Sequence, residues 1–287
     1  MTRFARGALG VCTLTVCLGV LPIGAQAAAQ DRELRVCADP NNLPFSNDRF
    51  EGFENKVAQL VADEMHATVR YTWHPQGRGF IRETLKAGTC DLVVGVPSGY
   101  DPVLATKPYY RSTYVFVFAK SRNLRLRSFD DPVLRPLTIG LEEIGSAGAN
   151  TPPAHALVRR GLVDNIVGFK MWDVDSVESP QGRIIDAVAA GEIDVAIVWG
   201  PFAGYFVRRR QLAAALEVVP VSSTIDPPSI PFAYDIAMGV RQGDSALKSE
   251  LEGILDRRRA DIERILEEYG VPLVNVQPHS GNEPEEQ

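Results

Sequence analysis

Alternating strand and helix patterns in the first part of the chain constrain its fold more than any other feature. Residues 34–38 and 91–96 are short, mostly apolar runs of the kind that buried parallel strands show. Between them, residues 52–66 carry an apolar stripe at helical spacing, residues 67–73 alternate as a strand does, and residues 80–86 suit a short helix stopped by Gly88. This βαβαβ order predicts parallel strands joined by helices in a doubly wound sheet.

The same alternation continues to the C-terminus. Further strands are expected at residues 113–119, 137–141, 166–172, 194–198, 216–221 and 232–240, with helices at 150–161, 181–190, 202–210 and one long helix at 244–269. The pattern predicts an α/β fold of two lobes, each a doubly wound and mostly parallel sheet. Lobe 1 would comprise residues 28–119 plus 230–274 and lobe 2 residues 120–229. Two hinge connections, near Ala119 and Ile230, would leave a cleft between them.

The N-terminal residues have the pattern of a secretory signal. Arg3 and Arg6 precede an apolar run from Ala8 to Ile23, and Ala25-Gln26-Ala27 supplies small residues for cleavage. We therefore expect a leader at residues 1–27 and a periplasmic product, with a flexible tail at residues 275–287. Removing two arginines from 30 basic residues leaves 28 against 36 acids, a balance of −8. This balance argues against nucleic-acid binding, for which a basic face is expected.

Only two cysteines, Cys37 and Cys90, remain once the leader is removed. Two cysteines in an exported protein most often pair. In the chain-entropy model, a disulfide that closes the long loop between them would stabilise the folded protein by several kcal/mol. The alternative is a pair of buried free thiols. Two cysteines do not suffice for a structural zinc site.

No motif for catalysis or for a cofactor is found. There is no G-x-S-x-G string, the four histidines lack a His-x-x-x-His spacing, and Gly77-Arg78-Gly79 lacks the third glycine of a dinucleotide fingerprint. The acids at Glu142-Glu143 and at residues 283–286 are expected to be solvated rather than metal ligands. We therefore expect no enzyme activity, no metal and no cofactor.

Four strings carry a resemblance to a known family: RVCADPNNLPFSN from Arg35, GFENKVAQLVADEM from Gly52, TLKAGTCDLVVGVPSG from Thr84 and KPYYRSTYVFV from Lys107. The chain resembles the bilobed periplasmic solute-binding proteins that serve amino-acid transporters. The resemblance is strongest to a subgroup of accessory proteins encoded with PQQ-dependent methanol dehydrogenases, the XoxJ/MoxJ type. It covers nearly all of the chain after the leader and implies a two-lobed binding-protein fold.

Two departures from the amino-acid binders bear on the ligand. The arginine with which those proteins clamp a ligand carboxylate is replaced by Gly99, and their D-x-P string, which holds the ammonium group, reads Trp199-Gly200-Pro201. Without these charge-assisted partners a zwitterion would be desolvated without compensation. A free amino acid is therefore not the expected ligand.

The expected cleft is instead aromatic and neutral. Its candidate residues are Asn42, Phe45, Ser98, Tyr110, Ser146 and Trp199, with Arg78 and Arg111 at the rim. Each of them could alternatively be a core or surface residue. Aromatic and arginine side chains favour protein interfaces. The sequence and the resemblance together predict a non-enzymatic periplasmic factor that binds a PQQ-dependent methanol or alcohol dehydrogenase during its maturation or activation. The alternative is a transporter-linked receptor for an uncharged small molecule. The occupant of the cleft would be a small molecule or a peptide segment.

Overall fold

The computed structural model describes residues 1–2, 32–144, 149–171, 180–222, 225–226 and 230–274. The described residues from Arg32 onwards form one compact unit. Nearly all of the predicted leader and all of the predicted tail lie outside the described residues, so both stay predictions.

The described residues contain seven α-helices and fifteen strands. The helices are α1 Phe53–Glu64, α2 Phe80–Glu83, α3 Pro152–Arg159, α4 Arg183–Ala190, α5 Gly200–Arg209, α6 Ser245–Arg257 and α7 Arg259–Glu268. The strands are β1 Arg32–Ala38, β2 Asn41–Asn42, β3 Ser46–Asn47, β4 Ala67–Trp73, β5 Leu92–Pro97, β6 Leu104–Ala105, β7 Tyr110–Ala119, β8 Ile139–Ile144, β9 Ala149–Asn150, β10 Ile166–Lys170, β11 Val195–Trp199, β12 Leu216–Pro220, β13 Ile225–Asp226, β14 Ile230–Pro231 and β15 Ala233–Val240.

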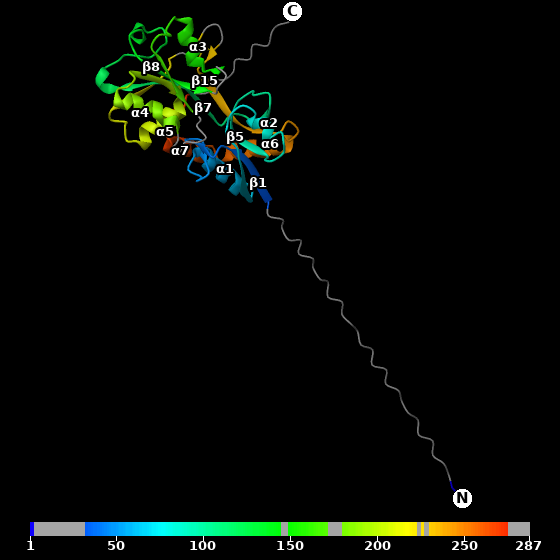
Figure 1. The fold of residues 1–287 in the computed structure, drawn as a ribbon. Coiled ribbons are helices and arrows are strands. Elements are labelled where there is room, and N and C mark those ends of the chain that lie inside the picture. The colour runs from blue at the N-terminus through cyan, green and yellow to red at the C-terminus, as the bar shows by residue number, and fades with distance from the viewer. Residues whose placement is uncertain (3–31, 145–148, 172–179, 223–224, 227–229, 275–287) are drawn as a thin grey trace, which may run out of the picture. The chain divides into compact units, whose positions relative to one another are not determined.

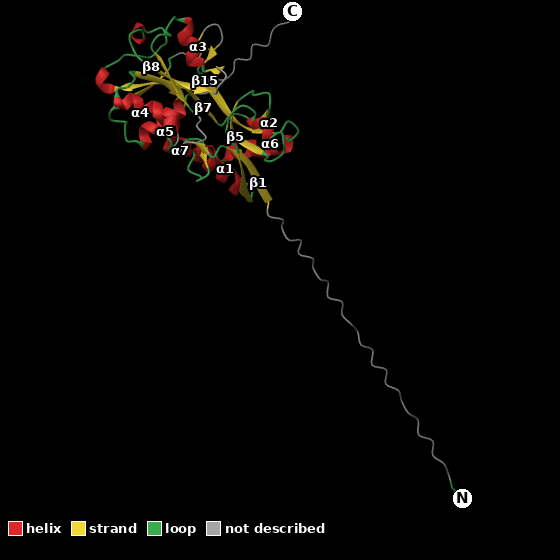
Figure 2. Cartoon of the chain, in the orientation of Figure 1, coloured by secondary structure: helices red, strands yellow, loops and turns green. Residues whose placement is uncertain are grey.

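The main sheet has the strand order β10-β8-β11-β7-β15-β5-β1-β4. Its two ends are parallel groups, β4-β1-β5 and β10-β8-β11, which confirms the predicted α/β class with helix-connected parallel strands. The sequence did not predict that β7 and β15 lie between these groups and run antiparallel to their neighbours. Figures 1 and 2 show these two strands between β8 and β5, with helices packed on both groups.

Strand β7 takes part in both groups. Residues 110–113 pair with β15, while residues 114–118 pair with β11 and residues 115–119 pair with β12. Its second half is an almost continuous apolar run whose side chains are buried on both faces. The sheet is therefore continuous through β7, and the lobe boundaries near Ala119 and Ile230 stay a prediction.

Helices cover the two strand groups with separate apolar clusters. In one cluster, α1 places Phe53, Val57 and Val61 against Leu251 and Ile254 of α6, and all five side chains are almost fully buried. A second cluster joins α4 and α5 to β7 and β11. The one-sided spacing of apolar residues that predicted these helices therefore marks the faces that they bury.

The C-terminal segment differs from the prediction of one long helix. The chain forms α6 and α7, with a break at Arg258, whose φ of −104° and ψ of 16° lie outside the helical range. The Arg258 guanidinium donates to Glu64 at the end of α1 and to Asp261 in α7. The break allows α7 to pack on α1 in a direction that a straight helix would not reach.

The predicted disulfide between Cys37 and Cys90 is present. The two Cα atoms lie 5.5 Å apart, and the bond joins β1 to the loop before β5. Both residues are buried with Phe80, Leu85 and Val93 in a small apolar cluster. The bond therefore fixes the segment that carries α2 against the sheet.

Candidate functional site

Three loops meet at the carboxyl edge of β1, β4 and β5, where ligands bind in open α/β sheets. The buried Asp39, which follows β1, accepts hydrogen bonds from the backbone N–H of Asn41 at 2.7 Å and of Gln76 at 2.5 Å. Burial raises the pKa of Asp39, and these two N–H donors partly oppose the shift. The Asn42 amide donates to Gln76 Oε1 at 2.8 Å. This network fixes the loop after β1 to the loop after β4.

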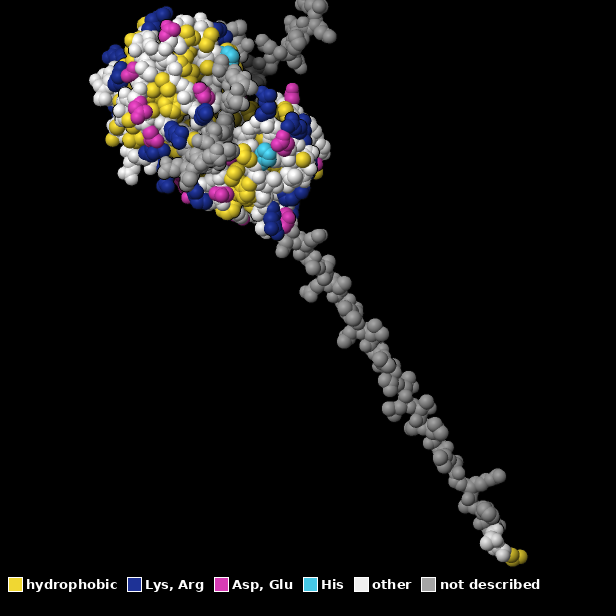
Figure 3. All heavy atoms as spheres, viewed as in Figure 1, with side chains coloured by type: hydrophobic (Ala, Val, Ile, Leu, Met, Phe, Trp, Pro, Cys, Tyr) yellow, Lys and Arg dark blue, Asp and Glu magenta, His cyan; other side chains and the backbone are white. Residues whose placement is uncertain are grey.

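An open groove of about 540 Å³ lies next to this network, between α2 and the end of β5. Its floor includes the apolar residues Phe80, Val93, Val96 and Pro97, and its rim carries Arg78, Arg82 and Lys86. We call it the α2 groove. Figure 3 shows Lys and Arg side chains gathered over α2, with an acidic side chain and a histidine beside them. The sequence predicted Arg78 at a cleft rim but missed Arg82 and Lys86.

Ser98 lies in a neighbouring depression. This hollow of about 280 Å³ is also lined by Gly99 and Tyr100, and Tyr100 lines the α2 groove as well. Gly99 has a φ of +76°, which a glycine adopts without strain. Ser98 and Arg78 are thus both exposed at the carboxyl edge of the first strand group.

Asn42 is buried and Phe45 is partly buried, and both contact elements of both strand groups. The Gln181 amide, before α4, donates to the carbonyl of Asn41 at 3.1 Å and to Asn42 Oδ1 at 3.4 Å. The Phe45 ring lies 5.3 Å from Phe53 of α1 and 5.1 Å from Phe202 of α5. Gln181 is fully buried, and its Oε1 has no hydrogen-bond partner within the described part of the chain. Sequence reasoning missed Gln181, because a glutamine after a proline resembles an ordinary helix start.

Trp199 ends β11 and contacts three apolar clusters. Its ring makes edge-on contacts with Tyr114 at 5.4 Å and Tyr234 at 5.7 Å, and it is only partly buried. Its backbone N–H donates to Glu142 Oε1 at 3.1 Å. These contacts place it inside the junction of β7, β11 and β15.

Tyr110 and Arg111 begin β7. Tyr110 is 5% exposed and packs edge-on against Phe53 at 6.0 Å. Arg111 donates to Asp235 of β15 at 2.6 Å, in a largely buried ion pair. Ser146 lies outside the described residues. Of the eight predicted residues, Arg78 and Ser98 therefore line open depressions, whereas Asn42, Phe45, Tyr110 and Trp199 are wholly or partly buried.

The expectation that Glu142 is solvated is wrong. Glu142 in β8 is 5% exposed, and burial raises its pKa to about 8, with the N–H of Trp199 opposing the shift. Its neighbour Glu143 is exposed, as expected. Alternation along the strand puts the two side chains on opposite faces of the sheet, so Glu142 faces the interior.

Glu54 of α1 is a second acid with a raised pKa, and its carboxyl lies against Gly95 of β5. A Cβ on Gly95 would lie 2.0 Å from Glu54 Oε1, so the absence of a side chain at Gly95 makes room for this carboxyl. Burial raises the pKa of Glu54 to about 8. The groups around Glu54 include Tyr109, whose buried hydroxyl has no hydrogen-bond partner among the described residues.

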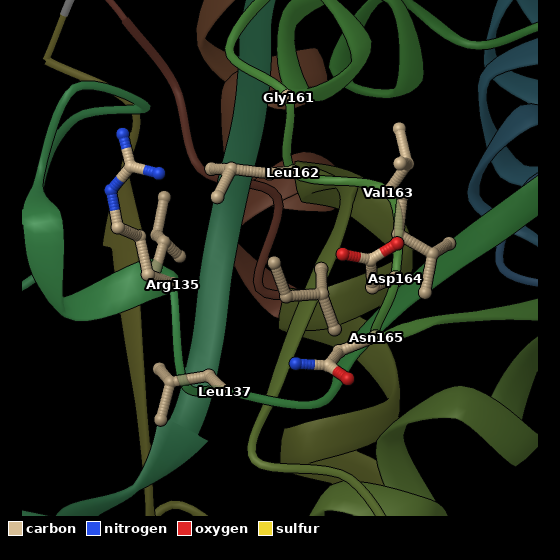
Figure 4. A pocket seen from close by; sticks show the side chains of 10 residues that line it. Arg135, Leu137, Gly161, Leu162, Val163, Asp164 and Asn165 are labelled. Atoms are coloured by element: carbon tan, nitrogen blue, oxygen red, sulfur yellow. The ribbon is translucent and has the colours of Figure 1, made fainter.

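A smaller cavity of about 130 Å³ lies elsewhere, beside the loop at residues 161–166. Figure 4 shows Leu137 and Leu162 facing it, with Arg135 to one side and Asp164 and Asn165 to the other. Its wall includes Ile139 and Ile166, the first residues of the parallel strands β8 and β10. It therefore lies at the amino edge of that strand group, opposite the edge where ligands bind.

The described residues contain no cluster of three or more His, Cys, Asp or Glu side chains that would suit a metal ion. Within the same residues, no helix has the length and apolar character needed to cross a membrane.

Comparisons with known proteins agree on one family. Residues 34–272 match the model of the bacterial extracellular solute-binding proteins, family 3. The chain is 30% identical to the protein MoxJ of Methylorubrum extorquens, over 94% of this chain and 97% of that protein. Among solved structures it is similar to the periplasmic binding protein XoxJ from Methylobacterium extorquens AM1, with 39% identity, 85% of this chain and 100% of that chain covered, and a TM-score of 0.69. It is also similar to MxaJ from Methlophaga aminisulfidivorans MPT, with 27% identity, 84% and 100% coverage, and a TM-score of 0.74.

Proposed function

This chain belongs to the bacterial extracellular solute-binding proteins of family 3, and from that premise we propose that it is a non-enzymatic periplasmic accessory factor. It binds a PQQ-dependent methanol or alcohol dehydrogenase and assists its maturation or activation. The similarity to MoxJ, XoxJ and MxaJ over nearly the whole chain supports this proposal. The partner would bind at the carboxyl edge of β4 and β5, where Arg78 and Ser98 are exposed.

The filled junction between the two strand groups is the observation that carries the proposal. Phe45 and Trp199 occupy the space with aromatic rings, and each contacts apolar clusters of both groups. Gly99 and Trp199 stand where charged clamps would be needed for an amino acid. A free amino acid entering here would lose water from both charged groups without gaining charge-assisted hydrogen bonds. An interior of this kind suits a protein that presents its surface to a partner.

A second candidate function is transport-linked binding of an uncharged small molecule. The observation that favours it is Gln181 Oε1, a buried acceptor that lacks a donor within the described residues, close to the Asn42 amide. Groups of this kind suit a neutral ligand with a hydrogen-bond donor.

Capture from periplasmic extract separates the two functions. The immobilised mature chain should retain a quinoprotein dehydrogenase, identified by mass, and the purified dehydrogenase should then bind in direct titration. Failure to bind, together with a neutral small molecule that raises the melting temperature, would instead support transport.

The proposal includes a leader at residues 1–27 that is removed on export. The N-terminal mass of the protein isolated from periplasm should correspond to a chain that starts at Ala28. An intact N-terminus in that fraction would contradict cleavage.

A further inference from the structure

We propose that the α2 groove binds an acidic, extended segment of the partner dehydrogenase. This inference rests on the function proposed above and names the chemistry of the partner's contact. The segment would lay apolar side chains on Phe80, Val96 and Pro97 and direct carboxylates to Arg78, Arg82 and Lys86.

Two of the rim cations are available for a partner. Arg78 and Lys86 are exposed, and neither forms an ion pair with another residue that the structure describes. Arg82 donates to Glu83 at 2.6 Å, and Glu83 also contacts His74 at 3.1 Å. Glu83 thus partly neutralises Arg82, and Asp101 is a further acid near the neighbouring depression. The rim keeps a net positive charge despite these two acids.

Charge complementarity favours an acidic occupant over a neutral one. The chain as a whole is acidic, with 36 Asp and Glu against 30 Lys and Arg. The net charge of the chain would therefore repel an acidic segment, while the α2 groove attracts one. Such local contrast steers a partner to one orientation and raises the association rate.

The shape of the groove favours a peptide over a small ligand. Small-molecule sites bury most of the ligand surface, whereas this groove is open and its rim residues Arg78, Arg82, Lys86 and Tyr100 are exposed. Its apolar floor is rigid, because Phe80 and Val93 belong to the buried cluster around the disulfide. A rigid apolar floor with a charged rim is the usual anatomy of a protein-binding surface.

The test compares two double variants of the mature chain for binding to immobilised methanol dehydrogenase. Arg78→Ala/Lys86→Ala removes the two free rim cations. Arg125→Ala/Arg135→Ala removes two exposed arginines outside the groove, so the charge change is the same. Melting temperatures of both variants should match the wild type, because none of the four side chains forms an ion pair with another described residue.

At low salt the groove variant should associate about tenfold more slowly than the wild type, since rim charges act mainly on the association rate. The difference should shrink in about 1 M salt, where screening reaches about 3 Å. The control variant should behave as the wild type. Equal association rates for the wild type and the groove variant would contradict binding of the partner at the α2 groove while leaving the proposed function intact. Absence of any binding by the wild type would overturn both.

A competition experiment separates a peptide from a free anion. A peptide of alternating glutamate and leucine should compete with the dehydrogenase for the wild type but not for Lys86→Glu. Free glutamate at the same carboxylate concentration should compete far less. Equal competition by free glutamate would make the groove a small-anion site and would overturn docking of a segment.

Discussion

Glu142 shows how a single buried carboxyl couples the stability of this protein to pH. Its pKa is raised from 4.5 to about 8 by burial. Between these values the folded chain holds a proton that the unfolded chain has released, so raising the pH favours unfolding. The free energy of unfolding should therefore fall by up to about 1.4 kcal/mol per pH unit from this group between pH 5 and pH 8.

Glu142→Gln should flatten this slope, because the amide keeps an acceptor for the N–H of Trp199 but does not ionise. The measurement is urea unfolding of the wild type and the variant at pH 5, 6.5 and 8. Glu143→Gln, at the adjacent exposed position, is the control and should keep the wild-type slope. An identical slope in Glu142→Gln would show that the carboxyl is solvated in the folded protein.

Substitution of Trp199 tests whether this residue stabilises the fold or contacts the partner. Its packing against Tyr114 and Tyr234 leads us to expect that Trp199→Ala lowers the free energy of unfolding by about 2–4 kcal/mol. Trp73→Ala is the matched control. Trp73 stacks on Tyr71 at 4.5 Å on the terminal strand β4 and should lose about 1 kcal/mol. An unchanged melting temperature for Trp199→Ala, with partner binding lost, would make Trp199 a contact residue.

At the scale of elements, the approach of α5 to the end of α7 joins the two strand groups. A Cβ on Gly204 would lie 1.8 Å from the carbonyl oxygen of Gly270, a backbone atom that has no freedom to swing aside. Arg208 of α5 donates to the carbonyls of Glu267 and Glu268, the last carbonyls of α7. This donation satisfies acceptors that a helix end leaves open and complements its dipole.

Gly204→Ala should therefore destabilise the protein by about 1–3 kcal/mol, because the methyl group forces α5 away from Gly270. Gly253→Ala in α6 is the matched control. Its nearest neighbour would be the flexible end of Arg257 at 3.3 Å, and alanine there should stabilise the helix by about 0.5–1 kcal/mol. Thermal unfolding of both variants measures the difference. A stabilising Gly204→Ala would mean that α5 and α7 do not touch at this point.

Elements were predictable where the local pattern decides them. The strands β1, β4, β5 and β11 and the helices α1 and α4 follow from apolar runs and stripes that burial requires. The break at Arg258 was not predictable, because no proline or glycine interrupts the amphipathic pattern there and the break is held by contacts with Glu64 across the structure. The antiparallel placement of β7 and β15 depends on long-range pairing, which no short segment encodes.

The candidate site shows the same division between local and long-range information. Arg78 lies between a predicted strand and a predicted helix and was named as a rim candidate, whereas Arg82 and Lys86 resemble any charged residues on an exposed helix. Glu142 was mispredicted because neighbouring acids usually indicate solvent, and its burial depends on the register of β8 against β11. Tyr110 was placed in the right segment, but only the packing of α1 shows that it is buried.

At the scale of the whole molecule, two features bear on the proposed function. The junction between the strand groups is occupied by the chain's own aromatic rings, and an open groove with a positively charged rim lies at the carboxyl edge of the sheet. Together they favour a partner that docks on the surface over a ligand that is enclosed.

The most direct test measures methanol oxidation by the dehydrogenase isolated from cells that lack this protein. Adding the purified mature chain should raise the rate of methanol oxidation. At the same protein concentration and at low salt, the Arg78→Ala/Lys86→Ala variant should raise this rate less. An unchanged rate with saturating wild-type protein, under conditions where the dehydrogenase from normal cells is active, would contradict the accessory role.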